Sequence, residues 1–535
     1  MKKSKRLTAL ALAALMCVGA LSGCGSETAA DYTLSVCVGE APETLDPAKV
    51  QTVSEETLTD HLYENLMQIA SSVSGGTTVE NGMARSYDVD ENADGTVDYT
   101  FHLRRAKWSD GTAVTAADFV YAWQRLADPV TASPNASLLS VVQGYETVRR
   151  GGDLSALAVS AKNDTTLVVT LSGKFDWFLS DVCTASATMP LPSGSDPSVP
   201  EGRIGNGPYV LKTSSETSWT LERNPYYYAE GSGPSELDFY FAQTADEAWE
   251  LYSAGTVDFV GALPETEYAK LAADANRTPV MQLSAEALLF NLQAEPMDNP
   301  SVREALSKAV DYAAVCEAAG PTVTAAEALI PAGVPGSGDE DFRSAGGALQ
   351  GTDAEGYEGR CEEARLALDE AGYDRDTLPA VELVCEDTER DTAVARSLCT
   401  AWRQVLGLHV TVRALTKDEL RGVLRSGEYT LALDEVRGLA NDAEGFLTQW
   451  RSNGENNVTH YSNSAYDTLL AVIARASDAS ARQACLHDAE SLFLSGYALT
   501  PLYHSAAAWK LRESFGGACR DARGFFSFRK VGPAS

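Results

Sequence analysis

Short apolar runs alternate with amphipathic segments along the chain, and this pattern predicts a mixture of strands and helices. Residues 33–38 form a mostly apolar run of strand length. Residues 97–103 place apolar side chains at every second position, which is typical of a strand with one buried face. Between them, Leu58, Leu62 and Leu66 recur at helical spacing. We therefore expect an α/β or α+β protein in which strands and helices are mixed throughout.

Two local signals mark where helices begin. Thr115 and Asp118 have the spacing of a capping box, in which the side chain of each residue bonds the backbone N–H of the other. Asn299 precedes Pro300, and proline is favoured in the first turn of a helix. The remaining pattern predicts helices at 362–371 and 392–406 and strands at 209–211, 237–241 and 409–413.

Domain organisation follows from length and from one unusual segment. A chain of 535 residues is long enough for two or three domains at about 150 residues each. Residues 190–207 are rich in Pro, Gly and Ser, which makes this segment the best candidate for a crossover between domains. No internal repeat is present.

The N-terminal segment has the layout of a secretory signal. Four basic residues precede an apolar run at 7–21, which is too short to span a bilayer and ends just before Cys24. Small residues leading into a cysteine resemble the bacterial lipobox, although Cys17 in the same run shows that a chance cysteine is possible. The resemblance implies a signal peptide at 1–23, diacylglycerol on Cys24 and a tether at 24–30. The protein would then be exported and anchored to the lipid bilayer, at the outer face of the cytoplasmic membrane or in the periplasm.

The charge of the chain excludes several partners. The formal net charge is −33, and removal of residues 1–23, which hold four basic residues and no acidic one, makes it −37. Such a surface repels nucleic acid and anionic lipid. After Cys24 no apolar stretch approaches the length of a membrane span, so the body of the protein is expected to be soluble.

The sequence carries no catalytic or metal-binding motif. Eight cysteines follow Cys24 without a CxxC pair, and they could be disulfides or buried free thiols. The segment 90–95 matches the first half of a calcium loop, but Phe101 stands where a bidentate carboxylate is needed, so a hairpin turn is the better interpretation. The six histidines are isolated, and no nucleophile motif is present. We expect no enzyme activity, no metal and no cofactor.

A set of short motifs follows the same order as in one known family. The longest is KWSDGTAVTAADFVYAW at 107–123, and shorter ones are TLDPA at 44–48, YENL at 63–66, GNGPY at 205–209 and LERNP at 221–225. Each is weak alone, but together they keep one order. From about residue 33 to residue 510, the chain resembles the oligopeptide- and dipeptide-binding proteins of ABC importers, solute-binding family 5.

This resemblance implies two lobes that close on a ligand like a hinged trap. One lobe, lobe I, would comprise residues 31–66, 196–283 and 504–535, with an extra domain at 67–195 packed beside it. Residues 284–503 would form lobe II. The expected partners are a small peptide and the permease subunits of an ABC importer, and we expect the protein to be a monomer.

The resemblance also implies where a ligand would bind. Peptides in this family lie extended and pair with protein backbone on both sides, as an added strand does. By position, Gln51, Thr52 and Val53 would be the backbone partner in lobe I. Residues 433–439 would be the partner in lobe II.

The second of these segments departs from the family pattern. Family members carry R-x-G-W-x-A-D-Y, whose aspartate neutralises the α-ammonium of the peptide. In this chain Leu439 stands at the aspartate position, Leu433 at the arginine and Val436 at the tryptophan, and upstream Asn135 replaces a tyrosine. A buried ammonium group beside leucine would lack its partner. We therefore predict that peptides with a free α-amine bind no better than N-acetylated ones.

Neighbouring charged residues are candidates for the missing contact. Asp434, Glu435 or Asp442 could take an ammonium group, unless the ligand has no free α-amine at this place. A solvated loop in a very acidic protein explains the three carboxylates equally well. Arg437 could pair with them or meet a carboxylate of the ligand.

Tyr503 and His504 match family positions that flank the ligand, although simple packing within a strand would also explain them. The function that these observations favour is capture of an extended peptide or peptide-like solute for a permease. A non-peptide solute such as a nickel complex, a sugar or an opine is an alternative on the same fold. A peptide-signal receptor or a lipoprotein with chaperone activity is a further one.

Overall fold

The computed structural model describes residues 31–534 except 72–76, 196, 198–203, 230–232, 273–279, 339, 374–376, 455 and 477. The proposed signal peptide, Cys24 and the whole of the proposed tether lie outside the described residues. No helix in the described ranges is long and apolar enough to cross a membrane.

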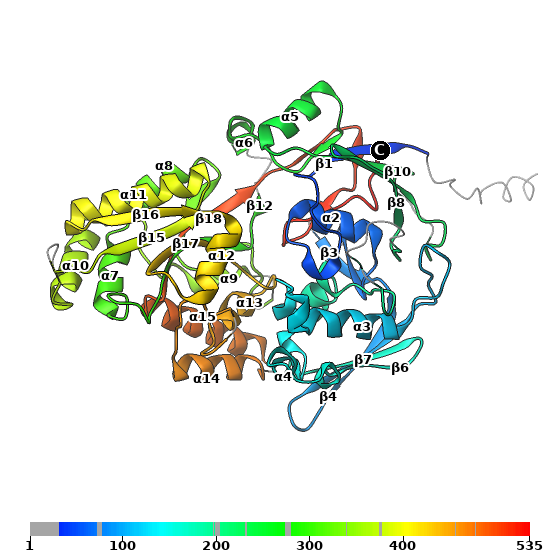
Figure 1. The fold of residues 1–535 in the computed structure, drawn as a ribbon, viewed down its shortest axis with the longest axis horizontal. Coiled ribbons are helices and arrows are strands. Elements are labelled where there is room, and N and C mark those ends of the chain that lie inside the picture. The colour runs from blue at the N-terminus through cyan, green and yellow to red at the C-terminus, as the bar shows by residue number, and fades with distance from the viewer. Residues whose placement is uncertain are drawn as a thin grey trace, which may run out of the picture.

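One half of the molecule, lobe I, is built on a six-stranded sheet that is drawn together from distant parts of the chain (Figure 1). Its central strand β1 runs parallel to β10 and β11, and β9 and β8 continue the sheet on the other side of β10. The strands are β1 (Thr33–Cys37), β8 (Tyr209–Ser214), β9 (Ser218–Arg223), β10 (Glu236–Tyr240), β11 (Phe259–Val260) and β19 (Lys510–Leu511). The helices are α2 (Val53–Leu62), α5 (Ala245–Ala254) and α6 (Glu265–Ala272).

A four-stranded antiparallel sheet lies beside the first one and shares its core. Phe101, Phe119 and Trp123 from this part pack in the same apolar cluster as Leu34 and Phe239. The strands are β4 (Ala84–Glu91), β5 (Val97–Leu103), β6 (Val159–Asn163) and β7 (Thr166–Leu171), and the helices are α3 (Ala116–Ala127) and α4 (Tyr145–Arg149). Short pairs complete this half: β2 (Met67–Ser71) with β3 (Thr77–Asn81), β20 (Phe515–Gly516) with β23 (Gly532–Pro533), and β21 (Cys519–Arg520) with β22 (Phe526–Ser527).

The other half, lobe II, is a seven-stranded sheet covered by helices on both faces. The strands are β12 (Val280–Met281), β13 (Ser284–Phe290), β14 (Val323–Ala325), β15 (Val381–Glu386), β16 (Val410–Leu415), β17 (Leu431–Arg437) and β18 (Leu499–Ala507). One face is covered by α7 (Pro300–Lys308), α8 (Tyr312–Ala319), α10 (Tyr357–Glu370) and α11 (Glu389–Leu406). The opposite face is covered by α9 (Phe342–Gly346), α12 (Lys417–Ser426), α13 (Ala443–Leu447), α14 (Ser464–Ile473) and α15 (Ala479–Ser495).

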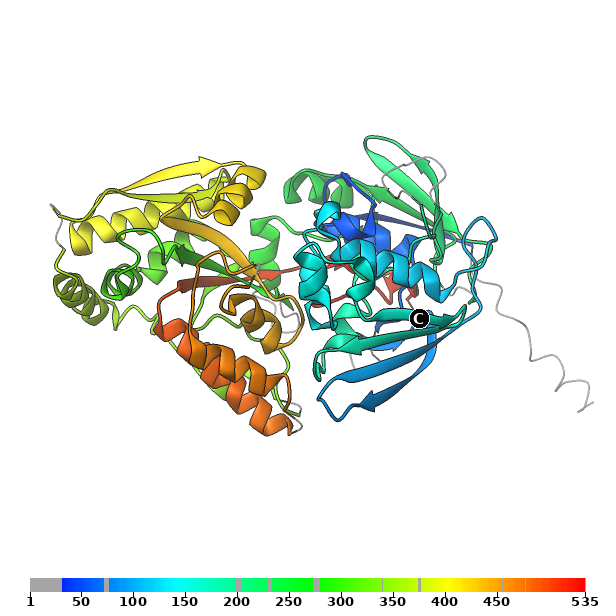
Figure 2. The same cartoon turned by 60° about the horizontal axis from the view of Figure 1, so that its bottom comes forward.

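Two segments carry the chain between the halves (Figures 1 and 2). On the way out of lobe I the chain leaves β11, and in lobe II it forms β12, which pairs with β18. On the return, β18 ends at Ala507 in the sheet of lobe II, and β19 begins at Lys510 in the sheet of lobe I. Two crossings set side by side are suited to act as a hinge.

The mixed α/β architecture agrees with the prediction from sequence. Asp118 accepts a hydrogen bond from the Thr115 backbone N–H at 2.8 Å, and Asn299 caps the helix that starts at Pro300. The turn at Asp94-Gly95 joins β4 and β5, as a hairpin does. The helix of Leu58 was expected to reach Leu66, but it ends at Leu62, because the backbone of Tyr63 is already extended.

The cysteines that follow Cys24 do not form disulfides. The eight cysteines that follow Cys24 are all free thiols in the structure, and six of them are buried. Burial raises the pKa of the Cys37 thiol to about 11, so this side chain behaves as a small apolar group.

Candidate functional site

The strand β17 has an edge that is only partly covered. Along its whole length β17 pairs with β13 on one side, from Leu431 to Arg437. On the other side β15 pairs with it only at Leu431 and Ala432. Within the described residues, no strand covers that edge from 433 to 437. An exposed row of backbone N–H and C=O groups is a template for an added strand.

The register of β17 decides which backbone groups reach the open edge. Just outside the ladder, the O atom of Thr430 and the N–H of Gly438 both bond the β13 side, with N···O distances of 3.1 and 2.9 Å. Because bonded and non-bonded pairs alternate in an antiparallel ladder, the even-numbered residues of β17 bond to β13. The N–H and C=O groups of Leu433, Glu435 and Arg437 therefore point away from β13. The parallel bridge between Val384 and Ala432 engages the Leu433 N–H, so the open edge begins at the Leu433 carbonyl.

Residues of lobe I lie opposite this strand. In Figure 1 the helix α2 lies on the side of lobe I that faces the other half. Gln51, just before α2, accepts a hydrogen bond from Arg421 of α12. Glu56, in the first turn of α2, interacts electrostatically with Arg437 of β17. The start of α2 and the end of β17 are thus close across the boundary between the two halves.

The three residues proposed as the backbone partner in lobe I are partly occupied. The backbone N–H groups of Gln51 and Thr52 both donate to one carboxylate oxygen of Glu55, at 2.8 and 3.1 Å. Thr52 caps α2, and Val53 is its first residue. Asn135 supports this segment, because its side-chain amide donates to the Val50 carbonyl at 2.7 Å. Asn135 therefore lies next to the proposed binding segment and holds its backbone.

Several residues of lobe II that were predicted to bind the ligand have their side chains inside the core of that lobe. Leu433 is 1% exposed and packs under α11, while Val436 packs on the opposite face of the sheet. Only the backbone of Leu433 can reach a ligand at the open edge. His504 is buried with its Nε2 3.2 Å from the Leu329 carbonyl, and burial lowers the pKa of its ring to about 4, so the ring is neutral.

Asp442 already has partners, so it is a poor replacement for the missing aspartate. Its carboxylate caps α13 and receives two hydrogen bonds from Arg482, at 2.9 and 3.1 Å. Leu439 is half-buried, and its backbone N–H donates to the Gly445 carbonyl at 3.1 Å. Of the three proposed candidates, Asp434 and Glu435 lie directly on β17.

Two carboxyl groups beside the open edge have pKa values close to neutral pH. Burial raises the pKa of Asp434 to about 7, and the charge of Glu435 acts in the same direction. Burial likewise raises the pKa of Glu56 to about 7, although Arg523 and Arg437 oppose the shift. Side chains with such perturbed pKa values are concentrated at functional sites. Glu435 itself is paired with Arg437 at 2.7 Å.

The fold brings further acidic residues, which were not predicted from the sequence, next to β17. Glu286 of β13 lies directly opposite Glu435. Burial raises the pKa of Glu286, and the charge of Asp391, in the first turn of α11, raises it further. A single acid inside the apolar run SAEALLF at 284–290 was the available signal. No group of three or more His, Cys, Asp or Glu side chains in the described residues could hold a metal ion.

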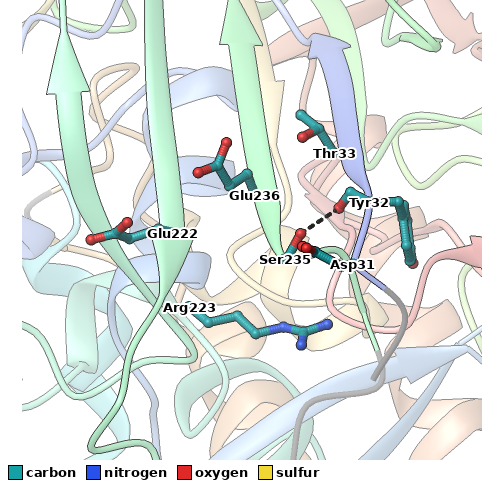
Figure 3. Close-up of a pocket in the computed structure, with 7 residues that line it drawn as sticks. All are labelled: Asp31, Tyr32, Thr33, Glu222, Arg223, Ser235 and Glu236. Atoms are coloured by element: carbon teal, nitrogen blue, oxygen red, sulfur yellow. Dashed lines mark hydrogen bonds between the residues drawn. The ribbon is translucent and has the colours of Figure 1, made fainter. Parts of the chain in front are cut away.

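A different hollow lies at the far end of β1 (Figure 3). It has a volume of about 650 Å³ and is lined by Asp31, Tyr32, Thr33, Glu222, Arg223, Ser235 and Glu236. Arg223 is occupied there, because its guanidinium donates to the carbonyls of Gly233 and Pro234. The residues discussed above, near the carboxyl end of β1 and around β17, do not contribute to this hollow.

Comparison with known proteins identifies the class. The model of the bacterial extracellular solute-binding proteins, family 5, matches residues 78–458. The chain is 30% identical over 492 residues to the probable deoxycholate-binding periplasmic protein YgiS of Escherichia coli, covering 89% of this chain and 88% of YgiS. It is 29% identical over 502 residues to the periplasmic oligopeptide-binding protein OppA of E. coli, covering 90% and 88%.

A solved structure shows the same fold over nearly the whole chain. The crystal structure of Haemophilus influenzae OppA in complex with the peptide RPPGFSPFR superposes with a TM-score of 0.78. It is 26% identical and covers 94% of this chain and 99% of OppA. The protein described here belongs to the bacterial extracellular solute-binding proteins of family 5, which are binding proteins of transporters and not enzymes.

Proposed function

We propose that this protein captures an extended peptide or peptide-like solute between its two lobes and delivers it to the permease of an ABC importer. The observation that carries the proposal is the uncovered edge of β17. Its residues 433, 435 and 437 offer backbone groups, and the start of α2 lies opposite. Backbone pairing gives affinity that depends little on side-chain identity.

The ligand-binding residues of the proposal fall into two groups. Leu433, Glu435 and Arg437 contribute backbone from lobe II, and the segment at Gln51 contributes from lobe I. In the structure the Glu435 N–H is bonded to the Asp434 carboxylate, and the Arg437 carbonyl to the side chain of Gln449. A peptide would exchange these local bonds for its own.

An anionic steroid fits this site less well. YgiS is named as a probable deoxycholate-binding protein, and deoxycholate carries a carboxylate. Beside β17 this chain gathers Glu56, Asp434, Glu435 and Glu286. Burial raises the pKa values of Glu56, Asp434 and Glu286, and repulsion from the charge of Glu435 raises those of Asp434 and Glu286 further. A second anion would add to that repulsion.

The direct test combines two readouts on the purified chain without its signal segment. Peptides of three to nine residues should raise the melting temperature, with about 2.7 kcal/mol of stabilisation at 100 times Kd. They should also leave the radius of gyration in solution scattering smaller or unchanged, never larger. Mass spectrometry of the co-purifying ligand identifies the natural solute. A saturating deoxycholate signal without any peptide signal would refute the proposal.

The proposal includes the lipid anchor and the domain limits of the sequence analysis, except that β12 and all of β18 belong to the sheet of lobe II. Cys24 would carry diacylglycerol and keep a soluble trap near its permease, and the trap itself would perform no covalent chemistry. The supporting observation is the sequence around Cys24. Cys24→Ala should abolish metabolic labelling with palmitate and release the protein from the membrane fraction. Labelling that persists in this variant would contradict the anchor.

A further inference from the structure

Three strands of lobe II place an acidic pair beside a tyrosine. Glu286 in β13 lies directly opposite Glu435 in β17 and, on its other side, opposite Tyr503 in β18. Directly opposed residues point to the same face of a sheet, with Cβ atoms about 4.5–5.5 Å apart. Two glutamates in this relation repel each other, so the arrangement lowers stability unless a cation lies between them.

Asp391 adds a third carboxylate from above the sheet. It lies in the first turn of α11, the helix that covers this face. The charges of Asp391, Asp434 and Glu435 all act on Glu286, and Arg390 is the opposing charge. Arg437 is already paired with Glu435. The region between β13, β17 and the first turn of α11 therefore carries more negative than positive charge.

The hydroxyl of Tyr503 is the independent sign of a missing partner. The side chain is 2% exposed, and its Oη atom has no hydrogen-bond partner within the described residues. Tyr503 lies directly opposite Glu286, and the charges of Glu286, Asp391 and Glu435 act on this hydroxyl against the opposing charge of Arg390. A buried hydroxyl without a partner is costly, and such groups call for an explanation in the function of the protein.

A ligand can reach these groups. Glu286, Asp391 and Glu435 are half-buried, and Glu435 lies on the open edge of β17. In a strand added to that edge, successive side chains would point to opposite faces of the sheet. Every second side chain of the ligand would then project toward α11 and the acidic group.

From this geometry we infer that Glu286, Asp391, Glu435 and the Tyr503 hydroxyl form a subsite for the ammonium or guanidinium group of a ligand side chain. The inference rests on the proposed capture of an extended peptide. The carboxylates would supply charge and the hydroxyl would accept one hydrogen bond. The α-amine of the ligand would lie in the plane of the sheet and not over this face.

The experiment uses N-acetylated pentapeptides that differ at a single position. A lysine is moved through an alanine background, and norleucine replaces it at each place as an uncharged analogue of similar length. Isothermal titration calorimetry should show that lysine at one position binds about tenfold more tightly than norleucine. Free-amine versions of the same peptides test whether the α-amine is the group that binds.

Three variants test which residues cause the preference for lysine over norleucine. In Glu286→Gln the advantage of lysine should fall to less than about threefold. In Tyr503→Phe affinity for the lysine peptide should fall about fivefold, while the melting temperature of the free protein stays the same or rises, because a buried unpaired hydroxyl has been removed. Glu428→Gln is the matched control, since Glu428 is exposed in lobe II away from the group, and it should bind like the unchanged protein.

The outcomes separate the inference from the proposed function. Peptides that bind without a lysine preference, or with one that Glu286→Gln leaves intact, overturn the subsite and leave peptide capture standing. A preference for the free α-amine that Glu286→Gln abolishes overturns the assignment to a side chain. If no peptide binds at all, both the proposed function and the subsite are refuted.

Discussion

At the scale of single residues, the unusual feature is a set of carboxyl groups placed where charge is disfavoured. Asp434 and Glu56 both have a pKa of about 7, and burial is the main cause in each case. At neutral pH these groups are poised between their two protonation states, so a small change in surroundings changes their charge. Binding of a cationic group nearby would favour the ionised form.

The raised pKa of Asp434 predicts how stability depends on pH. The folded chain holds this proton more tightly than the unfolded chain, whose aspartates titrate near 3.9. Stability from this group is therefore fully present below about pH 4 and is lost as pH rises toward 7. Asp434→Asn should leave stability unchanged near pH 4 and raise it by about 1 kcal/mol at pH 8, a value reduced to allow for partial exposure.

Urea denaturation at pH 4.5, 6 and 8 measures this difference. Asp164→Asn, at an exposed position in the turn before β7, serves as the control and should show no such trend. A constant effect of Asp434→Asn at all three pH values would mean that the carboxyl group is not perturbed in the folded protein.

At the scale of elements, the helix starts could be predicted from the sequence because local chemistry determines them. Helix starts at Asn299 and Thr115 were predictable because a cap acts within four residues. The end of α2 was not, because Leu66 keeps helical spacing while it is buried by tertiary packing in a loop. Leu433 was placed in the binding segment by its position in the family pattern, and strand alternation turns its side chain into the core.

Glu435 and Tyr503 were named from the sequence, but their grouping with Glu286 and Asp391 could not be predicted from it. The four residues come from β13, α11, β17 and β18, which are far apart along the chain and meet only through the order of the strands. The proposed backbone role of β17 follows from the family resemblance, but the register that turns residues 433, 435 and 437 away from β13 required the observed pairing.

The open edge of β17 predicts a periodic response to N-methylation of the ligand. Methylation removes one amide N–H at a time, and only alternate amides of an added strand face β17. We expect methylation at alternate positions to weaken binding about tenfold, as for loss of one buried hydrogen bond, with smaller effects in between. Calorimetry on a singly methylated series measures this. Equal losses at every position would exclude pairing with a single strand edge.

At the scale of the whole molecule, the halves also touch through the part that carries the four-stranded sheet. Asp181 accepts a hydrogen bond from the Asn441 N–H at 2.7 Å, and Trp177 donates its indole N–H to Glu444 at 3.2 Å. Ala440 packs in the apolar cluster of lobe I although it follows β17. The loop after the proposed binding strand is thus part of the contact between the halves, and in the proposed trap it would link ligand binding to closure.

This link predicts that weakening the contact weakens ligand binding from a distance. Trp177→Phe removes the bond to Glu444 but keeps an aromatic ring against Phe175, and Arg482 still pairs with Glu444 at 2.7 Å. A hydrogen bond worth about 1 kcal/mol would lower the closed fraction, and the apparent affinity for peptide falls in proportion, by about threefold to fivefold. Solution scattering should show a larger radius of gyration for the free variant and an unchanged one at saturating peptide.

The control is Trp219→Phe, which removes an indole bond to the Ser215 carbonyl within lobe I. It should alter neither the affinity for peptide nor the radius of gyration. Because, of these two indole bonds, only that of Trp177 crosses between the halves, an equal effect of both substitutions would show that the contact at Trp177 stabilises the fold without governing the trap.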